Sequence, residues 1–111
     1  MRSRHMDPRK RKKLEAGGWK TGSVRELLDL TPAEEAYIEI RLALADHLLM
    51  RRRSLKWTQA QVARLVKSSQ SRVAKMESGD PEISLDLLVT TLLELGASRK
   101  DLGRIVGSRA A

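Results

Sequence analysis

The sequence of 111 residues contains no cysteine, which excludes disulfide bonds, thiolate metal ligands and cysteine nucleophiles. Histidine is almost as scarce, because His5 and His47 are the only two and their spacing matches no motif that places two zinc ligands on one helical face. Ser69 and Ser71 have no base beside them that would activate a hydroxyl. We therefore expect no metal site, no cofactor or small-molecule ligand, no catalytic residue and no enzymatic activity.

Long hydrophobic runs are also missing. The longest apolar stretch, residues 83–95, is interrupted by Asp86 and Glu94 and is shorter than the roughly 20 residues that a transmembrane helix needs. In a signal peptide an apolar segment follows the basic start, and this chain has no such segment after its basic N-terminus. Together with the missing cysteines, these absences predict a cytoplasmic protein without membrane contact. Apolar residues still make up 41% of the chain, which is enough for one small core.

Acidic residues are absent from one central window. Between Arg51 and Lys75 the chain carries eight basic residues and no Asp or Glu. Over the whole chain, 22 Lys and Arg face 14 Asp and Glu, so the formal net charge is +8. A balance of this kind favours a polyanionic partner such as nucleic acid.

The N-terminal 20 residues form a separate basic segment. They contain eight Lys or Arg against Asp7 and Glu15, a net charge of +6, and almost no aliphatic side chains. Such a segment cannot bury enough apolar surface to order itself, so we predict a flexible basic arm over residues 1–20, of which residues 1–5 resemble a vector-derived leader. Three roles stay open for this arm: a contact to DNA, a contact to RNA, and charge that keeps the protein in solution.

Capping signals divide the rest of the chain into predicted helices, because Ser or Thr stands at or just before the start of each apolar periodic stretch. The predicted helices span residues 23–30, 32–53, 58–66, 69–77, 84–95 and 98–106. No stretch favours a strand. The predicted fold class is therefore all-α, with a helical extension over residues 21–40 and a five-helix domain that occupies residues 41–111 and shares the long helix with that extension.

Two of these helices have the spacing of a helix-turn-helix. The segments 58–66 and 69–77 are separated by a short turn near residues 66–68. At about 100° per residue, Val73 and Met76 face inward on the second helix, and the opposite side carries groups that can read base edges in the major groove. The predicted base-reading residues are Gln70, Ser71, Arg72, Ala74 and Lys75.

Residues around this second helix supply charge and hydrogen-bond donors for the DNA backbone. The predicted phosphate contacts are Arg52, Arg53, Lys56, Thr58, Gln59, Lys67 and Ser69. Glu77 lies on the same helix, where phosphate would repel its carboxylate. We therefore expect Glu77 to face inward and to form a structural ion pair with one of the arginines 51–53.

The segments TQAQVA and SQSRVAKMESG, residues 58–63 and 69–79, resemble the XRE-type helix-turn-helix of phage Cro and repressor proteins. The resemblance covers roughly residues 41–106 and implies a lambda-repressor-like fold. It also implies that Gln59 anchors DNA and braces the recognition helix, that Ser69 caps this helix, and that Glu77 is structural.

Two positions depart from the family pattern. The turn usually carries a glycine and an apolar residue, whereas this chain has Lys67 and Ser68. A left-handed backbone there costs about 1 kcal/mol relative to glycine. Trp57 also stands where a smaller aliphatic residue is usual.

The order of elements, a basic start, SVRELLDLTPAEEAYIEIRLALAD, the helix-turn-helix and SLDLLVTTLLELGAS, is similar to that of HigA-like antitoxins. The similarity implies a bacterial, nucleoid-associated repressor that controls its own operon and neutralises a RelE-fold, HigB-like toxin that cleaves mRNA. Acidic residues outside a minimal repressor, Glu34, Glu35 and Glu39, are the predicted toxin-binding residues. The alternatives are a stand-alone phage or host repressor of the same family and a helical protein-interaction module that never meets DNA.

The last two predicted helices are more apolar than one small core requires. We expect a homodimer, which would place two recognition helices about 34 Å apart on a palindromic operator of double-stranded DNA. The predicted interface residues are Leu88, Leu92, Leu95, Leu102, Ile105 and Val106. The alternative is that these side chains only fill the core.

Overall fold

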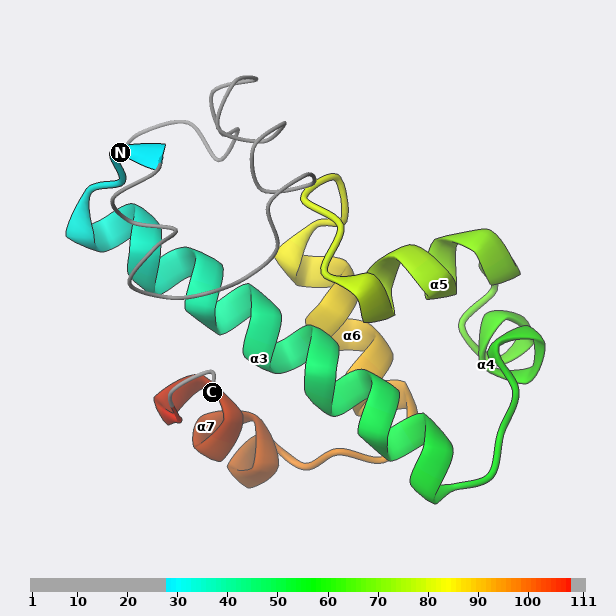
Figure 1. The fold of residues 1–111 in the computed structure, drawn as a ribbon. Coiled ribbons are helices and arrows are strands. Elements are labelled where there is room, and N and C mark those ends of the chain that lie inside the picture. The colour runs from blue at the N-terminus through cyan, green and yellow to red at the C-terminus, as the bar shows by residue number, and fades with distance from the viewer. Residues whose placement is uncertain (1–27, 109–111) are drawn as a thin grey trace. The chain divides into compact units, whose positions relative to one another are not determined.

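The computed structural model describes residues 28–108, which form helices joined by short loops (Figure 1). The helices are α3 (Pro32–Ser54), α4 (Gln59–Leu65), α5 (Gln70–Ser78), α6 (Leu85–Glu94) and α7 (Arg99–Gly107). No strand occurs within residues 28–108. The all-α prediction is confirmed, and each of these helices begins and ends within one residue of the predicted range.

The chain divides into two units, residues 1–37 and residues 38–111. The boundary lies inside α3. In the first unit the structure describes only residues 28–37, where Thr31 caps the start of α3: its hydroxyl accepts the Glu34 N–H at 3.1 Å, and the Glu34 carboxylate accepts the Thr31 N–H at 3.0 Å. The predicted basic arm and all but the end of the predicted helix 23–30 lie outside the described residues.

In the second unit a hydroxyl caps the start of every helix. The side chains of Thr58, Ser69, Ser84 and Ser98 each accept a backbone N–H from the first turn of the helix that follows. Thr58 and Ser98 complete reciprocal capping boxes with Gln61 and Asp101. Such a cap stabilises a helix by about 1 kcal/mol, which explains why these short helices begin where the sequence places a Ser or Thr.

Four helices end at a residue in the left-handed conformation. Gly79 follows α5 with φ +75° and Gly96 follows α6 with φ +92°. The other two helix ends carry lysines, because Lys56 follows α3 with φ +61° and Lys67 follows α4 with φ +56°. The left-handed backbone considered for the turn is thus present at Lys67, where an L side chain costs about 1 kcal/mol more than glycine.

The core of the second unit receives side chains from all five helices. Leu44, Leu48, Val62, Val73, Met76, Leu88, Leu92 and Ile105 are among its buried members. Trp57 and Leu102 are partly buried and pack against this cluster. The tryptophan that replaces a smaller residue is thus accommodated at the edge of the core.

This core corrects the predicted dimer interface. Leu88, Leu92, Leu95 and Ile105 have between 0% and 7% of their surface exposed within a single chain. A side chain that its own core already covers has no surface left for a second copy. Of the six predicted interface residues, Leu102 is partly buried and Val106 is exposed.

Arg41 is a buried cation on α3. It is 8% exposed, and its Nη2 donates a hydrogen bond of 2.9 Å to the carbonyl oxygen of Asp80. This bond ties α3 to the loop after α5. A β-carbon added to neighbouring Gly79 would lie 3.0 Å from the Leu42 side chain, so the same loop approaches α3 closely.

Within residues 28–108 no helix combines the length and apolar character that a membrane span requires. No group of three or more His, Cys, Asp or Glu side chains in this range could hold a metal ion.

Candidate nucleic-acid interface

Helices α4 and α5 pack directly against each other and are joined by the turn at residues 66–69 (Figure 1). Val62 and Ala63 are buried on α4, and Val73 and Met76 are fully buried on α5. The inward face of α5 is the one expected from the helical periodicity.

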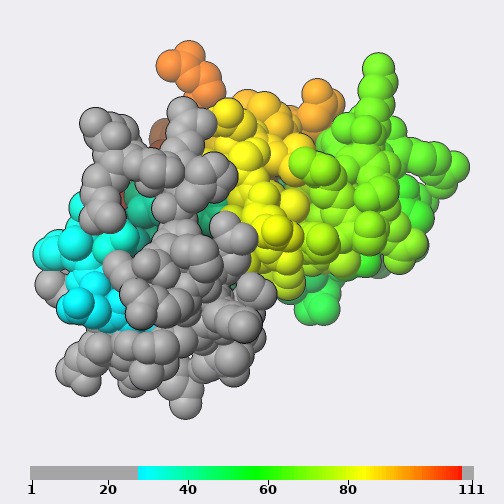
Figure 2. Space-filling model, turned by 90° about the horizontal axis from the view of Figure 1, so that it is seen from above, coloured from blue at the N-terminus to red at the C-terminus, as the bar shows by residue number. Residues whose placement is uncertain are grey.

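The outward side of α5 carries four exposed residues, Gln70, Ser71, Arg72 and Lys75, and half-buried Ala74. These are the five residues predicted to read bases, and the structure places all of them away from the buried pair Val73 and Met76. In the space-filling view the green surface that contains α4 and α5 projects side chains into solvent (Figure 2).

Exposed cations lie on α5 itself and on the segments that precede it, from the end of α3 to the turn before α5. They are Arg53, Lys56, Arg64, Lys67, Arg72 and Lys75, and none of them forms an ion pair with another residue of the described range. Arg64 was not among the predicted contacts. It lies two residues after buried Val62, so the helical period of α4 turns it outward, and this spacing could have identified it.

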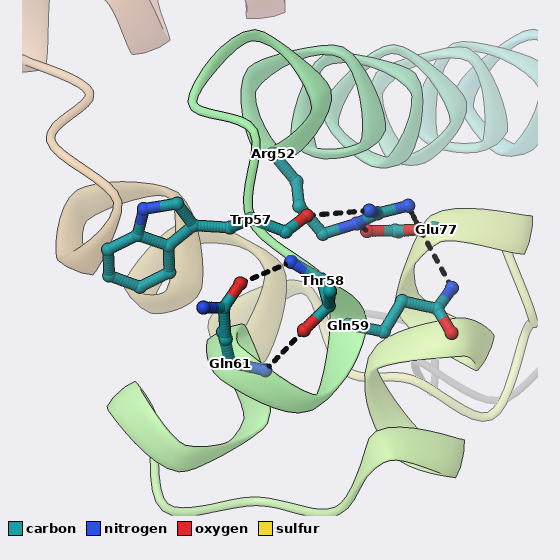
Figure 3. A network of polar contacts seen from close by, with 6 residues as sticks. All are labelled: Arg52, Trp57, Thr58, Gln59, Gln61 and Glu77. Carbon is teal, nitrogen blue, oxygen red and sulfur yellow. Dashed lines mark hydrogen bonds and ion pairs between the residues drawn. The ribbon is translucent and has the colours of Figure 1, made fainter.

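Arg52 is the exception among the predicted phosphate contacts. Its side chain is 13% exposed and pairs with the Glu77 carboxylate, with Nε 2.5 Å from Oε2 and Nη2 3.0 Å from Oε1. Nη1 donates a third hydrogen bond to the Trp57 carbonyl oxygen at 2.9 Å. These bonds leave Arg52 little capacity for a phosphate, so its role is to hold Glu77 (Figure 3).

The carboxylate of Glu77 lies inside, as expected, with 5% of its side chain exposed. Besides Arg52 it accepts a hydrogen bond of 3.0 Å from Nε2 of Gln59. The Arg52–Glu77–Gln59 network therefore joins α3, α5 and α4 (Figure 3). The hydrogen bond to Glu77 raises the pKa of Arg52 above its ordinary value; burial opposes this shift and the negative charge of Glu77 adds to it.

Three predicted phosphate contacts are polar residues at helix starts. Gln59 is half-buried in the network, and its amide keeps a second N–H and a carbonyl oxygen without a bond to any residue of 28–108. The exposed hydroxyls of Thr58 and Ser69 accept the N–H of Gln61 and of Arg72, each at 3.1 Å. Both hydroxyls serve as helix caps.

Of the three acidic residues predicted to bind a toxin, one has a structural role at the start of α3. Glu34 closes the capping box with Thr31. Glu35 and Glu39 are half-buried on the same helix.

Comparison with known families gives one match, since residues 48–102, about half of the chain, match the family model described as Helix-turn-helix. Comparison with curated proteins found no match, and comparison with solved structures found none either. The matched segment begins in the second half of α3 and ends in α7, so it contains α4, α5, α6 and the Arg52–Glu77–Gln59 network. Residues 48–102 are therefore a helix-turn-helix domain of the XRE family, a family of DNA-binding transcription regulators rather than of enzymes.

Proposed function

We propose that this chain is a transcriptional repressor that inserts α5 into the major groove of a specific operator. One observation carries the proposal. The exposed side of α5 is free of acid, six cations on α5 and on the segments before it are exposed, and Glu77, the acidic residue of α5, is neutralised inside by Arg52. A phosphate backbone can approach such a surface without meeting a carboxylate.

The exposed residues of α5 have the chemistry for base recognition. Gln70 can pair with both polar atoms of an adenine edge, and Arg72 with both acceptors of a guanine. Ala74 can contact a thymine methyl group, while Ser71 and Lys75 add shorter and longer hydrogen-bond donors.

Phosphate contacts would hold the protein in register without reading sequence. Arg53, Lys56, Arg64 and Lys67 supply charge for them. Gln59 would use the N–H that the network leaves open, and Thr58 and Ser69 would donate their hydroxyl protons, since each hydroxyl is already used as an acceptor by its helix.

The test is a titration of the full chain against its own promoter fragment and against a scrambled fragment of equal length, at two salt concentrations. We expect tighter binding to the promoter and salt-sensitive binding to both. Equal affinity for the two fragments would reduce the protein to a nonspecific basic binder. Absence of binding to either would overturn the proposal and favour a protein-interaction module.

Two kinds of variant separate base reading from backbone contact. Gln70→Ala and Arg72→Ala should each lower the preference for the promoter by about 1–3 kcal/mol, because each removes a bidentate base contact. Lys56→Ala should weaken binding to the promoter fragment and to the scrambled fragment equally. Lys100→Ala, which removes an exposed charge on α7, is the matched control and should leave both affinities unchanged. The same loss on both fragments for all variants would contradict this division of roles.

Two finer assignments extend the proposal. The first is a homodimer on a palindromic operator, for which exposed Val106 and half-buried Leu102 on α7 remain as candidate contacts. Light scattering of the full chain should give twice the monomer mass, and Val106→Asp should lower it. A monomeric mass at the concentration that saturates DNA would remove the dimer from the proposal.

The second assignment is an antitoxin role, supported by the similarity of element order to HigA-like antitoxins and by the acidic residues Glu34, Glu35 and Glu39 on α3. The partner would be a basic RelE-fold ribonuclease of about a hundred residues, encoded beside this gene. Coexpression with the product of the neighbouring gene should yield a stable complex and restore growth that the toxin alone arrests. Without such a complex, the chain is a stand-alone repressor.

A further inference from the structure

The two left-handed lysines stand at either end of α4. Lys56 lies between α3 and the Thr58 cap of α4, and Lys67 lies between α4 and the Ser69 cap of α5. At the other two helix ends of this kind the same chain uses Gly79 and Gly96. Asp29, before α3, is also left-handed with φ +53°, but aspartate adopts this conformation more readily than lysine. Within the described residues, lysine takes it only at the two ends of α4.

Hydrogen bonds fix the backbone at both lysines. After α3, the Lys56 N–H donates to Arg53 O at 3.0 Å and the Trp57 N–H to Arg52 O at 3.2 Å. After α4, the Lys67 N–H donates to Arg64 O at 3.3 Å and the Ser68 N–H to Ala63 O at 2.8 Å. Both are closed turns of the Schellman type, in which the left-handed residue is normally glycine. The strained conformation therefore belongs to the fold and not to a loose loop.

Neither lysine side chain contributes to folding in a way that offsets this strain. Both are exposed, neither belongs to the core, and neither forms an ion pair with any residue between 28 and 108. Strain of this sort concentrates at functional sites, where the side chain has a task outside the fold.

We propose that Lys56 and Lys67 are a pair of phosphate clamps on either side of α4, whose charge raises affinity for DNA while their backbone conformation lowers the stability of the fold. The inference rests on the proposed DNA-binding function and deepens it by assigning a trade-off between stability and affinity to these two turns. Glycine at either position should therefore give a more stable protein that binds DNA less well.

The experiment compares Lys56→Gly, Lys67→Gly and their combination with Lys56→Gln and Lys67→Gln in the full chain. Glycine removes both charge and strain, whereas glutamine removes the charge and keeps the strain. Lys100→Gln is the matched control, since Lys100 is an exposed lysine with helical backbone on α7, outside the proposed DNA-binding surface. The probe is a fluorescein-labelled scrambled duplex of about 30 base pairs, three turns of DNA.

Each glycine variant should unfold about 4 °C higher than the parent protein. Each should also bind the scrambled duplex roughly fivefold to tenfold more weakly at 0.1 M salt, with the slope of log K against log salt smaller by about 1. The glutamine variants should lose the same affinity with an unchanged melting temperature, whereas Lys100→Gln should change neither the affinity nor the melting temperature.

The outcomes separate this inference from the proposed function. If the parent protein does not bind the duplex at any salt concentration, the proposed function itself fails. If the parent binds but the glycine variants keep its affinity and salt slope, DNA binding stands and the clamp is overturned. Glycine variants that lose affinity without a higher melting temperature would overturn the trade-off.

Discussion

The carboxylate of Glu77 joins three helices. It accepts hydrogen bonds from Arg52 on α3 and from Gln59 on α4 while lying on α5 itself. Because α5 is the proposed recognition helix, the position of its base-reading side chains depends on this one group.

Replacement of Glu77 by glutamine keeps the shape of the side chain and removes its charge. The guanidinium of Arg52 then stays in a largely buried place without a counter-charge, so we expect Glu77→Gln to lower the free energy of unfolding by about 3 kcal/mol. Urea unfolding of the variant measures this loss. Glu94→Gln, at an exposed carboxylate on α6, is the control and should change stability by less than about 0.5 kcal/mol. Equal stability of both variants would mean that the pair contributes nothing.

Thr91 presents the opposite case, a buried polar group without a partner. It is 1% exposed, and its Oγ1 has no hydrogen-bond partner among the described residues, whereas the hydroxyl of Thr90 donates to the Asp86 carbonyl oxygen. Valine has the same shape as threonine without the unsatisfied hydroxyl. Thr91→Val should therefore stabilise the protein by about 1 kcal/mol in urea unfolding, while Thr90→Val should not. A loss of stability in Thr91→Val would show that the hydroxyl is satisfied in solution.

Single residues also show where prediction from sequence ends. The charge argument predicts that Glu77 pairs with one of three consecutive arginines, but neighbouring residues on a helix differ in direction by about 100° and their charges are alike. Which of them turns inward depends on how α3 is rotated against α5. For this reason Arg52 was wrongly assigned to the phosphate surface, and burial of Arg41 was not foreseen.

At the scale of helices, the sequence carries nearly all of the required information. Each start is marked by a hydroxyl that accepts a backbone N–H, and this signal is local. The helix ends at Gly79 and Gly96 are also marked locally, because glycine is the residue preferred in the left-handed conformation. The lysine ends are less visible, because nothing in a lysine signals a left-handed backbone, and only the resemblance to a family with glycine in the turn pointed to Lys67.

The capping box of α7 makes this helix sensitive to acid. The backbone N–H of Ser98 donates to the Asp101 carboxylate and lowers its pKa below the ordinary value; the Ser98 hydroxyl and the charges of Arg104 and Arg51 act in the same direction. The ordinary pKa of an aspartate carboxyl is about 4. Because the pKa of Asp101 is lower in the folded state, its ionised carboxylate stabilises the fold above about pH 4. This stabilisation is lost as the pH falls through the folded-state pKa of Asp101. Below about pH 4 we therefore expect α7 to loosen.

Amide exchange of α7, followed by NMR between neutral pH and about pH 2, measures this loosening. Asp101→Asn should show weak protection at every pH, because the neutral amide cannot replace the charged cap. Protection of α7 that stays constant across the acid range in the parent protein would contradict the prediction.

For the whole molecule, charge gives the clearest prediction. If the four exposed cations assigned to the DNA backbone, Arg53, Lys56, Arg64 and Lys67, all contact phosphates, log K should fall with log salt at a slope of about −4 for one chain. Titration of the full chain against the scrambled duplex across a salt series measures it. A slope near zero would mean that the basic surface does not face DNA.

The whole-molecule arrangement was also where the sequence was least informative. Fold class follows from helical periodicity and from the lack of strand patterns. The sequence does not show which leucines belong to the core and which to a dimer interface. A leucine at an inward helical position has the same pattern whether its own chain or a second copy covers it. Leu88 and Leu92 are fully enclosed by their own chain. Only the packing of all five helices reveals this.

The helix caps have a consequence in time as well as in energy. From α4 to α7 each helix is started by a hydroxyl next to it in sequence, so most of this structure is specified by neighbours along the chain. All-helical domains with such local contacts fold within microseconds to milliseconds. The bond between Arg52 and Glu77 spans 25 residues and closes a larger loop. We therefore expect helices α4 and α5 to form early and to gain their fixed orientation last, when this bond fixes α5 against α3.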